Sequence, residues 1–420
     1  MAKSFQVQEL RYRTETSFCE NINDLNSNTY AARLPLQGLP TVTLTQPRIA
    51  DESMVNALHQ RYPGYAGVRE GELEFTVFAT GHVTSTASGA LTSSHWLYTL
   101  LSKGLGGGNT GDTGTDIDTG AGTPDADTIY TTANPGDFAA GSILRVGSKG
   151  DGRGDGQAAA VSTVSSQTVE LLTALPGSAA DEDVVYAALV AYPASVGHTD
   201  LGGTTASLAF IASNLDTGAQ WHLLGCELMG LSLNLSIGSP PTLTFRYKVA
   251  WWARDADTTP SAVALATQNT GPWAGGGLFY QTVGTTTRAT IAAHSLSLSL
   301  DLGLVEHRTN DGAADYQTIT GYTRTHTRAS LTISQLYDTA PETLWDSDGP
   351  NTTYKHILCA SGTTDGKVFG FYLPKCFIDG NRPSREDVNG LTGVSHTLVA
   401  TEGPTTTSDL TKSPVRFFIA

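Results

Sequence analysis

The sequence predicts an all-β fold with minor helices, built as two tandem β-sandwich or barrel domains with a small β module inserted in the first. Three observations predict it. Apolar and polar residues alternate over several segments, Thr and Ser are abundant beside 45 Gly, and only 15% of the residues are charged. β-branched residues suit a pleated surface, and Gly supplies tight connections. With 420 residues the chain exceeds the usual size of one hydrophobic core, so two packed units are expected.

The chain begins with a segment that has little periodicity, residues 1–40, which we interpret as an extended N-terminal arm. A helix is predicted over Glu52–Arg61. Glu72–Phe78 then alternates between apolar and polar residues, as a half-buried strand does. Ser94–Ser102 predicts a second helix. These elements open the first predicted domain, residues 41–262.

A composition change interrupts this domain over residues 103–200. The segment opens Gly-rich and stays rich in Gly, Thr and Asp to about residue 127, which is typical of a flexible linker. Strand-like pieces separated by turn residues follow, at Ser142–Val146, Ala158–Val164, Val169–Leu172 and Val184–Val190. We interpret the segment as a linker and a small β module inserted at a loop, where insertions are best tolerated.

The strongest strand signals come after the insertion. Ser295–Leu304 places five leucines on one face and polar or small residues on the other, so one long half-buried strand is predicted. The same period of two appears at Leu231, Leu233, Leu235 and Ile237, and at Leu243, Phe245, Tyr247 and Val249.

Two hairpins suggest that the chain contains a duplication. Ala212-Ser213 is followed by four residues and Gly218, and Ala360-Ser361 by four residues and Gly366, with apolar runs on both sides. Each hairpin follows an alternating strand and a short helix with Trp, the second helix being predicted near Pro341–Trp345. The order strand, helix, hairpin, strand therefore occurs twice, which predicts a second domain over residues 263–420.

Residue patterns that carry chemistry are weak. Asp112, Asp116 and Asp118 offer oxygen ligands, but the Gly and Glu spacing of a calcium loop is missing, so a solvated linker is favoured. Arg153-Gly154-Asp155 is read as a loop rather than an adhesion motif. Asp379, Glu386 and Asp387 could imitate paired carboxylates, and Trp251, Trp252 and Trp273 could stack on sugars; turn, core and interface roles are favoured for these residues.

Signatures of enzymes and metal sites are missing from the sequence. The ten histidines form no H-E-x-x-H or H-x-H pair, and the four cysteines, Cys19, Cys226, Cys359 and Cys376, have no C-x-x-C spacing. Nucleophile-elbow, phosphate-loop and dinucleotide motifs are also missing. We therefore expect no enzyme, and we assign no catalytic, cofactor-binding or metal-binding residue.

The charge balance argues against direct binding to nucleic acid. The formal net charge is −15, and Lys and Arg are scattered singly, so the surface repels phosphate. No signal-peptide core and no run of eighteen apolar residues occurs, so a soluble cytoplasmic product without a membrane partner is expected.

The order of motifs in the second half carries a family resemblance. It runs through the strand Ser295–Leu304, the turn Thr320-Gly321-Tyr322, the strand from Arg328, the acidic segment Pro341–Trp345, the strand Val368–Pro374, Phe377–Gly380 and Asn389-Gly390-Leu391. This block, about a third of the chain, resembles the major tail tube proteins of siphophages, the lambda-like family. The first half is similar through Tyr65–Arg69 before the strand Glu72–Phe78.

The resemblance implies a structural function. Tube proteins of this family form β-sandwiches with a flanking helix, assemble into six-fold rings and stack through loops and arms. Some carry two tube domains per chain and build the ring from three subunits, which is the version that the duplication favours. The implied partners are other copies of the chain, the tape measure, tail terminator and distal tail proteins, and phage DNA that passes through the lumen without specific binding. The implied location is the virion tail, assembled in the bacterial cytoplasm.

Two alternatives remain open at this point. One is another virion structural protein, such as a capsid decoration or a tail-tip hub. The other is a carbohydrate-binding, adhesin-like protein, for which the Gly, Thr and Ser content and the Trp residues speak.

Overall fold

A computed structural model describes most of the chain, and its strands pair antiparallel. The described residues are 7–20, 30, 32–49, 65–82, 95–109, 115–116, 128–130, 138–148, 154–165, 168–173, 183–194, 207–215, 218–255, 264–273, 277–285, 288–309, 319–336, 353–362, 367–379, 384–388, 391–402 and 408–420. Within them the fold is predominantly β with two short helices, as the sequence predicts.

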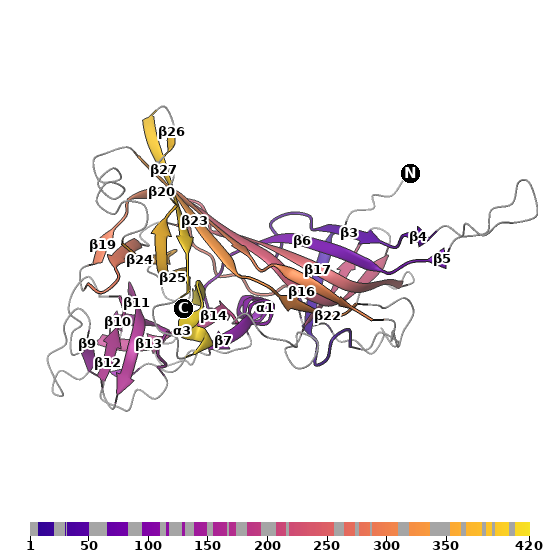
Figure 1. The fold of residues 1–420 in the computed structure, drawn as a ribbon, viewed down its shortest axis with the longest axis horizontal. Coiled ribbons are helices and arrows are strands. Elements are labelled where there is room, and N and C mark those ends of the chain that lie inside the picture. The colour runs from indigo at the N-terminus through magenta and orange to yellow at the C-terminus, as the bar shows by residue number, and fades with distance from the viewer. Residues whose placement is uncertain are drawn as a thin grey trace, which may run out of the picture.

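An extended path of eight strands crosses the molecule, and we call it the long sheet (Figure 1). Each strand pairs with the next in the order β3 (Thr41–Thr45), β6 (Glu70–Phe78), β17 (Thr242–Asp255), β16 (Gln220–Ser236), β20 (Ala293–Asp301), β23 (Arg328–Leu336), β27 (Leu391–Ala400) and β26 (Ser384–Val388). The strands predicted from alternation at residues 72–78, 231–236 and 243–249 all lie in this sheet.

A row of aliphatic side chains runs across six of these strands. Register places them opposite one another in the order Val77, Leu243, Leu233, Leu298, Leu331 and Leu398. All six are at most 2% exposed. Buried side chains of helix α1 (Trp96–Leu105) and of residues 357–373 belong to the same core and pack with the apolar face of the long sheet.

The first half of β16 has a different neighbour from its second half. Leu208–Ser213, which form β15, pair with the start of β16 and with β1 (Glu9–Thr14), and β1 also pairs with β2 (Ala32–Arg33). This confirms the predicted hairpin at Gly218. Part of residues 1–40, predicted to be an extended N-terminal arm, is packed into the fold, because β1 is buried and pairs with β15 and β2.

The second predicted hairpin is also present, as β24 (Lys355–Ala360) and β25 (Phe369–Ile378). β25 pairs with the C-terminal strand β28 (Arg416–Ile419), which continues through β14 (Leu189–Pro193) to β7 (Gly106–Asn109). On its other edge β24 pairs with β18 (Leu278–Thr282), followed by β19 (Arg288–Thr290). Short helix α3 (Asp409–Lys412), which the sequence did not predict, precedes β28.

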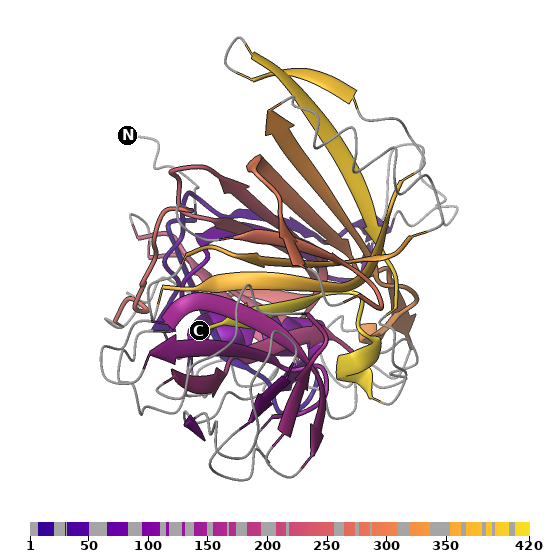
Figure 2. The ribbon, with the colours of Figure 1, turned by 90° about the vertical axis from the view of Figure 1, so that its left-hand side faces the viewer.

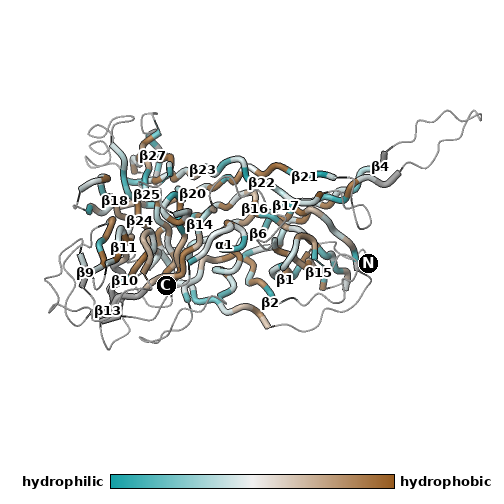
Figure 3. The backbone as a smooth tube through the Cα atoms, turned by 60° about the horizontal axis from the view of Figure 1, so that its bottom comes forward, coloured by the Kyte–Doolittle hydropathy of each residue, from teal (hydrophilic) through white to brown (hydrophobic). Residues whose placement is uncertain are grey.

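A separate sheet of six strands occupies one end of the molecule (Figures 1 and 2). Its order is β8 (Thr115–Asp116), β13 (Asp183–Ala187), β10 (Ile143–Ser148), β11 (Gly154–Ser165), β12 (Thr168–Leu171) and β9 (Thr128–Tyr130). One face packs on β24, β25 and β28 through Ala158, Ala160, Leu358 and Phe418. Figure 3 shows hydrophobic segments gathered in this region. β7 and β14 lie within residues 103–200 but pair outside the small sheet.

The long strand predicted over Ser295–Leu304 is broken in the structure. β20 ends at Asp301, and β21 (Leu304–Arg308) pairs with β22 (Ile319–Arg324) in a sheet of their own. The break lies at Gly303, where φ is +45°, and both the amide and the hydroxyl of Thr325 donate to the Gly303 carbonyl. The hairpin from β20 to β23 is therefore kinked, a feature that side-chain alternation does not reveal.

The remaining predicted elements have mixed outcomes. The second predicted helix is confirmed as α1, whereas the helices predicted at 52–61 and 341–345 lie outside the described residues. Ile237, expected on the buried face of its strand, is 60% exposed just beyond the end of β16. The short pair β4 (Arg48–Ile49) and β5 (Tyr65–Ala66) projects at the opposite end from the small sheet (Figure 1). The division into domains stays a prediction.

Candidate assembly surface

The outer face of the long sheet carries mainly hydroxyl side chains, and we call it the hydroxyl face. Because side chains alternate along a strand, each strand of the aliphatic row places its intervening residues on this face. They are exposed or half-buried: Thr76, Thr242, Thr244, Ser232, Asn234, Ser236, Ser295, Ser297, Ser299, Ser330, Thr332, Ser334, Ser395 and Thr397. Six strands thus form one uncharged surface that is mainly polar, with Phe78 opposite Thr242 and Val399 opposite Ser330 as apolar positions on it.

Several of these side chains bond to one another across strands. The hydroxyl oxygens of Thr76 and Thr244 are 2.8 Å apart, and Ser297 donates to Asn234 Oδ1 at 2.9 Å. A longer contact of 3.5 Å joins the hydroxyls of Thr332 and Thr397. Side chains that satisfy one another offer fewer free donors to a ligand. This surface is therefore polar, yet poorly suited to holding a phosphate.

A row of alternating charges bounds the hydroxyl face on one side. Glu74 lies opposite Arg246, and Asp301 lies opposite Arg328. Between the two pairs is Gly230, where an added Cβ would meet Arg246 Nη2 at 2.6 Å, so the guanidinium lies against the glycine backbone. Burial acts to raise the pKa of Asp301, but hydrogen bonds from His326 and Gly303 and the charge of Arg246 hold that pKa below its usual range.

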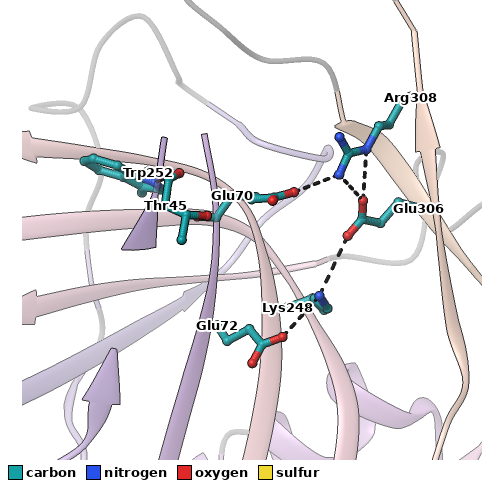
Figure 4. A network of polar contacts seen from close by, with 7 residues as sticks. All are labelled: Thr45, Glu70, Glu72, Lys248, Trp252, Glu306 and Arg308. Carbon is teal, nitrogen blue, oxygen red and sulfur yellow. Dashed lines mark hydrogen bonds and ion pairs between the residues drawn. The ribbon is translucent and has the colours of Figure 1, made fainter. Parts of the chain in front are cut away.

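Beyond the charge row, an ionic network joins β6, β17 and β21 (Figure 4). Arg308 lies 2.7 Å from Glu70 and 2.6 Å from Glu306, while Lys248 lies 3.1 Å from Glu72 and 3.9 Å from Glu306. The hydrogen bond to Glu306 is the main cause that raises the pKa of Arg308. Each cation here has acidic partners, so the network presents no unpaired positive charge.

The kinked hairpin covers the outer face next to this network. Ile319 and Tyr322 of β22 pack on Leu224, Ala250 and Trp251 of the long sheet. Over the other end of the sheet, where β20, β23 and β27 meet, the side chains of the hydroxyl face are exposed on β20 and half-buried on β23 and β27, among the residues that the structure describes.

One buried ion pair lies where the neighbour of β16 changes from β15 to β20. β15 stops pairing with β16 at Cys226 and β20 begins at Gly230, which leaves Glu227 without a strand partner on that side. Arg324 fills this notch: it donates to Glu227 at 2.8 Å and to the carbonyls of Gly104 and Leu105 at the end of α1. Burial raises the pKa of Glu227 to about 7, although the positive charge of Arg324 acts to lower it.

Among the residues that the structure describes, the positions that the sequence marked for chemistry are not gathered into a site. Within the described residues, no group of three or more His, Cys, Asp or Glu could hold a metal ion. All four cysteines are free and buried, and burial raises the pKa of their thiols. The side chains of Asp112, Asp116, Asp118 and Arg153-Gly154-Asp155 lie outside the described part. Asp379 and Asp387 are exposed, the latter in β26.

The tryptophans are packed rather than displayed. Trp251 is 4% exposed and Trp273 6% exposed. Arg69 lies over the rings of both Trp251 and Trp252, with its guanidinium 5.5 and 5.4 Å from their centres, and the Trp252 indole N–H donates to Thr45. An open aromatic platform for a sugar ring is therefore not formed by these residues, and the predicted core role is confirmed for Trp251 and Trp273.

The sequence predicted neither the charge row nor the buried contacts of Arg324. Their residues are far apart along the chain, and only the register of the strands brings them together. Alternation identifies which residues share a face of one strand, but it does not give the partner strand.

Comparisons with known proteins add no family to this picture. No protein-family model matches the chain, and no curated protein matches it. Among the described residues, no helix is long and apolar enough to cross a membrane.

Proposed function

We propose that the chain is the subunit of a long-tailed bacteriophage tail tube, which self-assembles into stacked rings around a channel that conducts DNA. The observation that carries the proposal is the hydroxyl face, supported from behind by the aliphatic row of Val77, Leu243, Leu233, Leu298, Leu331 and Leu398. A wide, rigid and uncharged polar sheet suits the wall of such a channel.

The charges near this face support the same role. DNA binds proteins mainly where Lys and Arg release its counterions, and a channel wall must avoid that affinity. Arg246 and Arg328 each lie opposite a carboxylate, and Lys248 and Arg308 take part in the ionic network. With a net charge of −15, the chain as a whole also repels phosphate.

The finer form of the proposal is the version with two tube domains per chain. The hairpins β15–β16 and β24–β25 lie in residues 41–262 and 263–420, which supports a duplication, and we assign the small sheet to an insert in the first domain. Three subunits then complete a ring with six domains. The partners are further copies of the chain, the tape measure, tail terminator and distal tail proteins, and DNA in the lumen, in a virion tail assembled in the host cytoplasm.

Electron microscopy of the purified protein tests the proposal. At high protein concentration we expect stacked annuli of uniform bore, and class averages of single rings with three-fold symmetry. Six-fold symmetry with six chains per ring contradicts the version with two tube domains per chain, but it agrees with a tail tube. A monomer that forms no polymer in any condition, or a clear single-sugar hit on a glycan array, contradicts the tube itself.

A further inference from the structure

Strand β28 has different neighbours on its two faces. Phe417 and Ile419 belong to the main core, whereas Phe418, which lies between them, belongs to the cluster that the small sheet forms with β24 and β25. All three side chains are at most 1% exposed. Because side chains alternate along a strand, one face of β28 packs on the main core and the other face packs on the small sheet.

Polar contacts hold the small sheet against the same region. Arg416 of β28 is 1% exposed and donates to the carbonyl of Gly141, just before β10, at 2.8 Å. A Cβ added at Gly141 would lie 3.1 Å from Leu410 Cγ, so the backbone there lies directly against α3. Arg288 of β19 donates to the carbonyl of Ala158 in β11 at 2.9 Å. A buried donor that loses its acceptor costs free energy, so the Arg416 bond in particular opposes separation of the small sheet from β28.

The small sheet and β28 are also joined through a shared stretch of backbone. β13 of the small sheet ends at Ala187, and the chain continues through Ala188 into β14, which pairs with β28. The Ala188 amide donates to the Ile143 carbonyl of β10 at 2.9 Å, so the bonding of the small sheet extends to this junction. Movement of the small sheet therefore displaces a strand that pairs directly with β28.

The small sheet has only a small core of its own. The buried members of that core among the described residues are Phe138, Leu144, Ala159, Val161, Val169, Leu171 and Ala187. A core of this size supplies little free energy of folding by itself, so packing on β28 has to supply part of the stability. We infer that the small sheet is a clamp on β28: the two form one cooperative unit that opens together, and the small sheet is not an independent appendage. The inference concerns the inside of one subunit and does not depend on the proposed tube.

Hydrogen exchange of the full chain tests the inference. Val169→Ala weakens the small sheet from inside, since Val169 is fully buried in its core and is not part of the cluster that faces β28. Glu170→Gln changes the next residue, which is exposed, and serves as the matched control. Arg416→Met removes the bond to Gly141 from the side of β28. Each variant is first checked for the wild-type circular dichroism spectrum, and exchange is then followed by mass spectrometry on peptides from β10, β11 and β28, with β6 and β17 as the reference.

We expect Val169→Ala to speed exchange in β10, β11 and β28 by the same factor, about tenfold or more, because a cavity in the small core makes opening of the whole unit easier. Arg416→Met has the same effect, while exchange in β6 and β17 stays within about twofold of the wild type and Glu170→Gln matches the wild type throughout. Faster exchange in β10 and β11 alone overturns the clamp, since β28 then stays closed when the small sheet opens. An equal increase in β6 and β17 also overturns it, because opening is then global.

Discussion

Arg324 connects three elements that no backbone pairing joins. It comes from the end of β22, passes the notch between β15 and β20, and contacts Glu227 and the last carbonyls of α1. Arginine suits this position because its planar group donates in several directions at once. The side chain is 4% exposed, so its bonds form away from bulk water.

Removal of this cation leaves a buried carboxylate without its partner. We expect Arg324→Met to lower the free energy of unfolding by about 3–5 kcal/mol, the usual range for breaking a buried pair on one side. The double variant Arg324→Met with Glu227→Gln recovers part of the loss, because the unpaired charge is gone. Urea denaturation followed by circular dichroism measures these differences.

Arg308 supplies the matched control for that experiment. It also bridges two carboxylates, but its side chain is 48% exposed, so water screens its ion pairs. We expect Arg308→Met to change the free energy of unfolding by less than about 1 kcal/mol. Equal losses of unfolding free energy in Arg324→Met and Arg308→Met contradict the conclusion that burial makes the Arg324 ion pair important for stability.

At the scale of elements, the long sheet depends on two kinds of position that alternate along one strand. Leu298 is 1% exposed at the middle of the aliphatic row, and the next residue, Ser299, is exposed on the hydroxyl face. Their energetic roles follow from burial, because only the leucine loses its contact with water on folding.

Neighbouring substitutions to Ala separate these roles. Leu298→Ala leaves a cavity between Leu233 and Leu331, and we expect a loss of about 2–5 kcal/mol in the free energy of unfolding. Ser299→Ala changes it by no more than about 0.5 kcal/mol. Chemical denaturation of both variants measures the contrast. A large loss in Ser299→Ala shows instead that hydroxyl contacts stabilise the sheet.

Alternation predicted much of this sheet, since β6, β16, β17, β20 and β23 each show the period of two. It could not predict the bend at Gly303, because Leu302 and Leu304 continue the pattern while the backbone turns. It also missed β1, whose residues Glu-Leu-Arg-Tyr-Arg-Thr are buried on both faces with Arg11 and Glu9 paired to each other. Charged residues that pair with one another can be buried, so a search for alternating apolar residues does not find such a strand. The hydroxyl face was foreseeable strand by strand, whereas its extent depends on which strands become neighbours.

For the whole molecule, buried titratable groups oppose one another in how stability depends on pH. Burial raises the pKa of Glu15 to about 7, although Ser207, Arg13 and Gly225 contact its carboxyl group. Burial lowers the pKa values of His95 and His356 to about 4. Between pH 4.5 and 6.5 the folded state holds the extra proton at Glu15, whereas the unfolded state holds extra protons at the histidines.

The signs of these two contributions follow from linkage. Stability falls with rising pH wherever the folded state binds more protons, as at Glu15, and rises with pH wherever the unfolded state binds more, as at the histidines. Burial raises the pKa of Glu227 to about 7 as well, so two carboxyl groups oppose the two histidines and the slopes offset each other in the wild type below pH 6.5.

Glu15→Gln removes the contribution of Glu15 to the dependence of stability on pH. We expect the variant to gain stability relative to the wild type as pH rises from 4.5 to 7, by up to about 1.4 kcal/mol per pH unit, and to stay level above pH 7. Its own stability then falls more steeply than that of the wild type as the solution is acidified from pH 6.5, because the histidine contribution is then opposed only by Glu227, whose pKa burial also raises to about 7. Urea midpoints at half-unit intervals from pH 4 to 8 measure both curves. Glu20→Gln is the control: the hydrogen bond from Thr16 lowers the pKa of that half-buried carboxyl, so its contribution to stability changes only below about pH 4.5 and the variant runs parallel to the wild type from pH 4.5 to 8. Parallel curves for the wild type and Glu15→Gln contradict a protonated, buried Glu15 in the folded protein.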